Sequence, residues 1–422
     1  MDTIIDTPQA RYLGQRTGQV SCWAGIPYAR APVGALRFEP PQPAESAGAF
    51  TIDTRSLGAI APQLPSRLAT VMGHFNAHQS EDCLNLSIWR PEPAASQALP
   101  VLIWVHGGAW VSGGGALPWY DGAHLAATQQ CIVVGINYRL GALGWLAQEE
   151  GDANLGLLDI ELALQWVSRN IGCFGGDAGR MTAMGQSAGA ENLASLLHRN
   201  PVFQRVILQS APLGRPLRSL EQAYRVRDWV YEAWGVTSKE EAKRLPLDTL
   251  LAGQSSPQVV QRMQQHGMAG QAYGVVADGR IVPFESRADF MRSAAVMPSV
   301  LGATRDEMLA FPGGEDRQAH RRAGLALFND GAQAWQQQAA AAGQDCWRYE
   351  FTWGPTESFG SCHCIDLPFT FGNWDAFEGA PMLAGGDPGG MRELGGRFQD
   401  MIGRMVRHGS PGWDAASDVQ VF

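Results

Sequence analysis

The chain has 422 residues, 45% of them hydrophobic and 17% charged, and its formal net charge at pH 7 is −9. This length is sufficient for one large α/β domain or two smaller ones. The negative charge argues against a nucleic-acid partner, because an acidic surface repels the phosphate backbone, and no apolar run is long enough to cross a membrane.

The first 90 residues predict β-structure at one edge of the fold. Residues 8–45 are rich in proline, which excludes a long helix and favours a segment that wraps an edge. Residues 81–90 alternate apolar and polar side chains, with Leu84, Leu86 and Ile88 in the apolar positions. This alternation predicts a strand with one buried face.

The next segments predict the centre of a sheet. Residues 101–105 and 131–138 are almost continuously apolar and β-branched, as is typical of strands covered on both faces. In residues 154–170 the leucines and one tryptophan recur at helical spacing, which predicts a helix.

A short glycine-rich segment, Gly185-Gln186-Ser187-Ala188-Gly189, separates an apolar run that predicts a strand from a periodic run that predicts a helix. A nucleophile elbow requires this setting, because its turn is so sharp that the residues beside the exposed serine must be small. The five-residue pattern alone is weak evidence, and a serine in an ordinary glycine-rich loop is the alternative.

The remaining chain continues the alternation of strands and helices. Further strands are predicted at residues 206–209, 299–304 and 347–353. The alternation predicts an α/β fold with a mostly parallel, twisted central sheet and helices on both faces.

Two stretches break this alternation. Residues 213–270 are mostly polar and helical, with the clearest amphipathic helix at 220–234, and residues 311–342 end in a Gln/Ala-rich helix at 332–341. We expect a single domain, residues 1–422, with cap-like insertions at about 213–270 and 311–342.

The predicted strand ends also carry the parts of an acyl-transfer site. A serine hydroxyl needs a base, an acid that holds the base, and donors for the oxyanion. Glu307, preferred over Asp306, follows the strand at 299–304, and His363 lies after the strand at 347–353. The order serine, acid, histidine is the one that α/β-hydrolases use.

Candidate oxyanion donors follow the strand at 101–105. The segment His106-Gly107-Gly108-Ala109 has small residues that let backbone N–H groups approach a substrate, and the Ala188 N–H lies beside the candidate nucleophile.

A series of motifs in one order carries a family resemblance. They are Gly25-Ile-Pro-Tyr-Ala, Leu36-Arg-Phe, Ser80-Glu-Asp-Cys-Leu-Asn-Leu, Trp104-Val-His-Gly-Gly-Ala, Asn137-Tyr-Arg, Asn154-Leu-Gly-Leu-Leu-Asp159, the block at 163–177 and Gly185-Gln-Ser-Ala-Gly. From about residue 7 to about 407 the chain resembles the type-B carboxylesterases, the cholinesterase-like branch of the α/β-hydrolases, as a shortened bacterial-type member.

The resemblance implies an α/β-hydrolase fold with a reduced helical cap. It places the nucleophile on Ser187, the acid on Glu307 and the base on His363. It places the oxyanion donors on Gly108, Ala109 and Ala188, so the residues and the resemblance indicate the same six positions.

The departures from the family pattern are also informative. Most members have Glu where this chain has Gln186, so a charge beside the imidazole is missing. Cys83 lacks the partner cysteine that many relatives have, because Ala61 stands there. The interval from Glu307 to His363 is shorter than usual, mainly within residues 311–325, which predicts a more open pocket.

Several other residues are weaker candidates. Trp110, Trp119, Tyr120 and Gln186 are candidate substrate contacts, although aromatic residues more often belong to the core. Cys362 and Cys364 flank His363, but a zinc site needs four ligands and no second cluster appears, so we expect no metal. His106 is expected to fix its loop by a hydrogen bond.

The sequence therefore predicts a serine carboxylic-ester hydrolase that acts on small, mostly neutral esters through an acyl-enzyme, without a cofactor. Amide or carbamate hydrolysis with the same triad is the close alternative, and a non-catalytic binding protein of this fold is a remote one. The seven dispersed cysteines favour reduced thiols and a cytoplasmic location. No oligomeric state is predicted.

Overall fold

The computed structural model describes the whole chain except residues 47, 49, 94–96, 149–151, 269–271, 285, 312–315 and 416–418. Within this part of the chain, a 12-stranded sheet forms the centre of the molecule, with the order β1-β2-β3-β5-β7-β6-β8-β9-β12-β13-β14 and β4 beside β2. Its strands are β1 Asp2–Asp6, β2 Arg11–Thr17, β3 Val20–Pro27, β4 Thr51–Asp53, β5 Asn85–Pro91, β6 Leu99–Val105, β7 Ile132–Ile136, β8 Gly176–Gln186, β9 Arg205–Gln209, β12 Ser299–Thr304, β13 Cys346–Phe351 and β14 Gln420–Val421.

The sheet is parallel from β7 through β14 and antiparallel at β1, β2, β3 and β5, so the predicted mostly parallel α/β sheet is confirmed. A separate pair of short strands, β10 Arg218–Ser219 and β11 Val276–Ala277, lies outside the main sheet.

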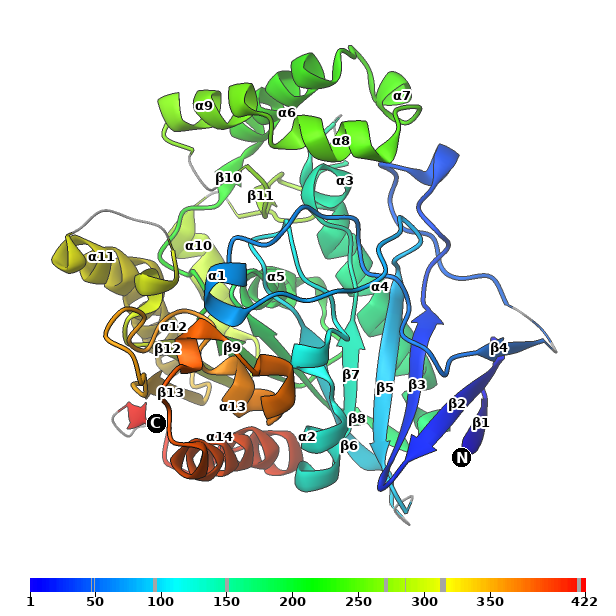
Figure 1. The fold of residues 1–422 in the computed structure, drawn as a ribbon, viewed down its shortest axis with the longest axis vertical. Coiled ribbons are helices and arrows are strands. Elements are labelled where there is room, and N and C mark those ends of the chain that lie inside the picture. The colour runs from blue at the N-terminus through cyan, green and yellow to red at the C-terminus, as the bar shows by residue number, and fades with distance from the viewer. Residues whose placement is uncertain are drawn as a thin grey trace.

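The helices are α1 Ala69–Met72, α2 Ala123–Gln129, α3 Gly141–Trp145, α4 Leu155–Asn170, α5 Ala188–Leu196, α6 Leu220–Trp234, α7 Lys239–Ala242, α8 Leu247–Gln254, α9 Pro257–Gln265, α10 Arg287–Met291, α11 Arg317–Gly324, α12 Asp330–Ala341, α13 Leu367–Phe371 and α14 Pro388–His408. Figure 1 shows α6 to α9 as a layer at one end of the sheet, far from α14. In the chain segments that the structure describes, no helix combines the length and apolarity needed to span a bilayer.

Side chains of the central strand β6 alternate between two hydrophobic clusters. Val101, Ile103 and Val105 pack in the cluster that contains residues of α4 and α5, whereas Leu102 and Trp104 pack in the cluster that contains residues of α2 and α14. Since successive side chains of a strand point to opposite faces, helices cover both faces of the sheet, as the continuously apolar segments predicted.

The prediction of one exposed face for β5 is wrong. Six of its seven residues are buried, because Leu86 and Ile88 pack in the cluster that contains residues of α4, while Trp89 packs in the cluster that contains residues of α2. Its polar side chains are tolerated because they find partners: Asn85 Nδ2 donates to the carbonyl of Ala59, and Ser87 Oγ accepts from the N–H of Gly25. Hydrogen bonding therefore replaces solvent at these positions.

The two stretches that interrupt the alternation contain the helices α6 to α9 and α11 to α12. The amphipathic helix predicted at 220–234 is α6, which begins with a capping box between Ser219 and Gln222. The predicted insertion boundaries include residues 269–270 and 312–315, which lie outside the described residues.

Candidate active site

Ser187 lies at the sharp turn between β8 and α5, with φ 55° and ψ −121°. The turn brings Gly185 and Gly189 so close that a Cβ on Gly185 would lie 2.6 Å from the carbonyl carbon of Gly189. A Cβ on Gly189 would lie 2.1 Å from the carbonyl oxygen of Val105. The two glycines are therefore required by backbone contacts, which explains why small residues flank the serine at this elbow.

Glu307 and His363 are in contact at the edge of the sheet where β12 and β13 end. Glu307 opens the short 3-10 helix Glu307–Ala310 after β12, and His363 lies in the loop after β13. The Nδ1 of His363 is hydrogen-bonded to Oε2 of Glu307, and the backbone N–H of His363 donates to the Glu307 carbonyl at 3.2 Å. Oε1 of Glu307 accepts from the N–H of Thr304 at 2.8 Å, so the carboxylate is fixed on both sides.

Both members of this pair are 1% exposed. Burial disfavours the imidazolium, but the sulfur of Cys364 and the carboxylate of Glu307 outweigh burial and hold the pKa of His363 above its ordinary value. The buried contact with Glu307 therefore favours the charged imidazole that arises when His363 accepts a proton.

The second ring nitrogen of His363 faces Gln186. Nε2 of Gln186 lies 3.1 Å from Nε2 of His363 and donates to Sγ of Cys364 at 3.4 Å. Because an amide nitrogen can only donate, the unprotonated nitrogen of the ring is Nε2, and the ring proton lies on Nδ1 toward Glu307. This is the tautomer that a general base requires.

The loop after β6 turns at two consecutive residues with positive φ, Gly108 and Ala109. Gly108 has φ +113° and Ala109 has φ 53°, and a Cβ on Gly108 would lie 1.9 Å from the carbonyl oxygen of Ser112. Gly108 and Ala109 line the same pocket as Ser187 and His363. The third predicted donor, Ala188, is the first residue of α5, where helix N–H groups lack intrahelical partners.

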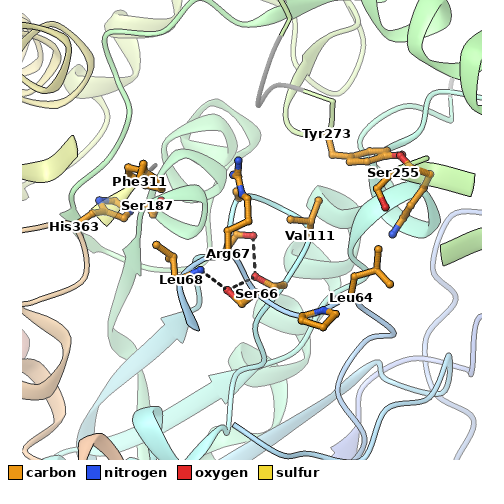
Figure 2. A pocket seen from close by; sticks show the side chains of 15 residues that line it. Leu64, Ser66, Arg67, Leu68, Val111, Ser187, Ser255, Tyr273, Phe311 and His363 are labelled. Atoms are coloured by element: carbon orange, nitrogen blue, oxygen red, sulfur yellow. Dashed lines mark hydrogen bonds between the residues drawn. The ribbon is translucent and has the colours of Figure 1, made fainter. Parts of the chain in front are cut away.

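The pocket has a volume of about 210 Å³. In Figure 2, Ser187, His363 and Phe311 lie at one end, Tyr273 and Ser255 lie at the other, and Arg67 stands between them. Its walls are Leu64, Pro65, Ser66, Arg67, Leu68, Gly108, Ala109, Val111, Ser112, Ser187, Gln254, Ser255, Tyr273, Phe311 and His363.

The four predicted substrate contacts do not line this pocket, which corrects the prediction. Trp119 and Tyr120 pack in the core, where Trp119 stacks on Phe377 and Tyr120 packs against Phe371 of α13. Trp110 is buried and donates from Nε1 to Asn192 Oδ1 at 2.8 Å, and Gln186 contacts the histidine instead.

Sequence reasoning missed the segment 64–68, which supplies a third of the pocket wall. This segment lies outside the motifs of the strand ends, so no local pattern placed it at the site.

Two further predictions concern neighbouring histidine and cysteine residues. Nδ1 of His106 is hydrogen-bonded to the carbonyl of Gly107 at 2.8 Å, and burial lowers the pKa of His106 to about 4, so it fixes the loop as a neutral ring. All seven cysteines, Cys83 included, are free. Among the described residues, no group of three His, Cys, Asp or Glu side chains is placed to hold a metal.

This combination of an elbow serine, a buried histidine–glutamate pair and a mostly parallel sheet defines an α/β-hydrolase of the serine type. The model of the carboxylesterase family matches residues 1–319, and the chain belongs to this family. Its activity is the hydrolysis of carboxylic esters, and a Ser-His-Glu triad is standard for the family.

Two relatives and two solved structures are similar over most of their length. The chain is 37% identical to a probable N-octanoylanthranilate hydrolase of Rhodococcus erythropolis, over 97% of this chain and 94% of the relative. It is 31% identical to the para-nitrobenzyl esterase of Bacillus subtilis, over 89% and 84%. A PNB esterase structure has a TM-score of 0.86 at 27% identity, covering 97% and 91% of the two chains. A carboxylesterase of Geobacillus stearothermophilus has a TM-score of 0.81 at 28% identity, covering 99% and 93%.

Proposed function

We propose that Ser187, His363 and Glu307 form the catalytic triad of this carboxylesterase, and that the N–H groups of Gly108, Ala109 and Ala188 bind the oxyanion. The observation that carries the proposal is the hydrogen bond between His363 and Glu307 at the wall of the pocket that Ser187 also lines. Nε2 of His363 becomes the proton acceptor for Ser187 when it gives up the hydrogen bond from Gln186.

In this mechanism, His363 Nε2 takes the proton of Ser187 as Oγ attacks the ester carbonyl. The tetrahedral oxyanion is held by the backbone donors, and its collapse breaks the ester bond while His363 returns the proton to the leaving alcohol. Water then attacks the acyl-enzyme by the same proton transfers and releases the acid. Glu307 stabilises the imidazolium in both steps.

We treat the chain as one hydrolase domain, with the helices α6 to α9 and α11 to α12 as caps over the site. The pocket of about 210 Å³ suits a small-molecule ester, and exposed wall residues such as Leu64 support access from solvent. The free thiols support a reducing, cytoplasmic location.

The direct test is covalent labelling with a fluorophosphonate, which reacts with activated serines. We expect one equivalent of label on Ser187, identified by peptide mass spectrometry, with parallel loss of ester hydrolysis. Matched ester and amide substrates then separate the two activities: a higher kcat/KM on the amide would contradict the ester assignment. A protein that stays unlabelled at Ser187 would contradict the triad.

The contact between Gln186 and His363 gives a prediction about pH. In Gln186→Glu, a carboxylate replaces the amide beside Nε2 and stabilises the imidazolium, which raises the pKa of His363. Because the base must be neutral to act, the acid limb of the kcat/KM profile moves to higher pH by about one unit.

Gln186→Met is the matched control, since it removes the hydrogen bond without adding charge. Its acid limb is expected slightly above the wild-type position, because the lost amide hydrogen bond favoured the neutral ring, but below that of Gln186→Glu. The buried Asp366 nearby, whose pKa burial and Glu307 raise to about 7, is common to all three proteins and cancels in the comparison. Coincident acid limbs for Gln186→Glu and the wild type would contradict the role of Gln186.

A further inference from the structure

The pocket contains one permanently charged side chain. Arg67 belongs to its wall, is exposed, and makes no ion pair with any residue that the structure describes. Among the residues that the structure describes, no Asp or Glu belongs to the pocket wall. In a chain of net charge −9, the wall of the pocket that Ser187 lines thus has an arginine without a carboxylate partner among the described residues.

The second observation is a buried arginine behind the end of the pocket that Tyr273 lines. Arg218 on β10 is 6% exposed, and its three guanidinium nitrogens have no hydrogen-bond partner. It pairs in register with Val276 on β11, three residues after the wall residue Tyr273. Burial lowers the pKa of Arg218 to about 10, so the group stays positive at neutral pH.

Two more arginines add to this buried charge. The guanidinium of Arg215 lies 4.7 Å from the Trp110 ring, and its Nη2 pairs with Oε2 of Glu191 at 2.8 Å. Arg287, on α10, also has three buried nitrogens with no hydrogen-bond partner among the described residues, and its guanidinium lies 4.5 Å from the Phe290 ring. Glu191 therefore compensates only one of three neighbouring positive charges, and buried charges are normally paired.

We infer that the catalytic pocket recognises esters that carry an anionic group, such as a carboxylate, with Arg67 as the direct counter-ion. The planar guanidinium can accept a carboxylate in a two-point contact. The buried arginines behind Tyr273 make the potential of the pocket positive and so favour the same charge. Neutral esters remain substrates, but an anionic group of matching shape raises kcat/KM.

The inference rests on the proposed function, because it concerns the substrate of the same pocket. Its test uses pairs that differ only in charge: 4-acetoxybenzoate against 4-acetoxybenzamide, and monophenyl adipate against its carboxamide analogue. The first pair carries the charge on the leaving group, and the second carries it on the acyl group. All rates are corrected for the uncatalysed reaction.

We expect the wild type to prefer the carboxylate member of at least one pair by about fivefold in kcat/KM, the upper range for a partly exposed ion pair. Arg67→Gln abolishes this preference, measured within the variant as the ratio of kcat/KM on the carboxylate to kcat/KM on the carboxamide. Arg67→Lys retains part of it, and Arg392→Gln, on the distant helix α14, retains all of it. Raising the ionic strength reduces the preference, because exposed charges are screened.

Equal kcat/KM for the members of both pairs, or a preference that survives in Arg67→Gln, would overturn the inference. The proposed function fails separately: in this experiment it is contradicted if the carboxamide esters are hydrolysed without Ser187 or are not hydrolysed at all.

Discussion

Replacing Ser187 by alanine is expected to lower kcat/KM on a p-nitrophenyl ester by about 10⁴-fold or more, the largest effect of any single change in this chain. The variant keeps the pocket and the oxyanion donors but has no oxygen to attack the carbonyl. The alanine side chain is smaller than the serine side chain, so the elbow can accommodate it. Initial rates over a range of substrate concentrations, with protein concentrations high enough to detect the residual rate, give the comparison.

Two controls make the result specific. Ser195→Ala removes a hydroxyl from the same helix, where Oγ donates to the carbonyl of Glu191 rather than facing the pocket, and should retain near-wild-type kcat/KM. Ser187→Ala/His363→Ala should lose little more than Ser187→Ala alone, because residues that act as a unit are not additive. Substantial turnover by Ser187→Ala, at an unchanged thermal midpoint, would mean that another group attacks the ester.

The proposed triad could be recognised in the sequence because its members lie where parallel strands end. Ser187, Glu307 and His363 follow β8, β12 and β13, and the carboxyl ends of parallel strands meet at one edge of a sheet. No local pattern predicts the order of strands in a sheet. The alternation of strands and helices, together with the family motifs, was nevertheless sufficient to predict that the three residues lie close together.

The pocket wall could not be predicted in the same way. Arg67 and Leu64 belong to a segment of irregular backbone between β4 and β5, whose position depends on long-range contacts. One of them is the hydrogen bond from Gln63 Nε2 to the carbonyl of Gly113 at 2.8 Å. Such long-range contacts leave no periodic pattern in the sequence. The sequence therefore pointed to the aromatic residues near the oxyanion loop, which do not line this pocket.

The sequence placed Gln186 beside the imidazole, but it did not predict the hydrogen bond between them. The sequence showed that an amide replaces the usual carboxylate, but the direction of the side chain depends on the bend of the elbow. A Cβ on Gly107 would lie 2.5 Å from Oε1 of Gln186, so the glycine leaves room for the amide to reach the imidazole. The identity of residue 107 therefore matters to the base, although it does not touch the base itself.

A buried ion pair supports the other side of the pocket. Arg139, after β7, donates from Nη2 to Oδ1 of Asp159 at 2.7 Å and from Nε to Oδ2 at 2.8 Å, with exposed side-chain fractions of 3% and 0%. The pair holds the start of the loop that carries α3, where the N–H of Ala142 donates to Oε1 of the wall residue Gln254 at 2.7 Å. One ion pair therefore explains both motifs: it joins Arg139 of Asn137-Tyr-Arg to Asp159 of the segment Asn154 to Asp159.

Asp159→Asn is expected to lower the free energy of unfolding by about 3–5 kcal/mol, because it leaves the Arg139 guanidinium buried without a charged partner. The midpoint of urea unfolding, followed by tryptophan fluorescence, measures the loss. Asp400→Asn, which breaks an exposed pair with Arg404 on α14, should change stability by less than about 1 kcal/mol.

Replacing both members of the buried pair shows whether the loss of stability comes from the unpaired charge of Arg139 or from the lost attraction between the two side chains. If the uncompensated charge causes the loss, Arg139→Met/Asp159→Leu is more stable than Asp159→Asn, since apolar residues carry no desolvation penalty. The double variant still lacks the bonds that position the loop before α3, so its kcat/KM should stay below that of the wild type. An Asp159→Asn protein within about 1 kcal/mol of the wild type would show that the pair is not the support that its burial indicates.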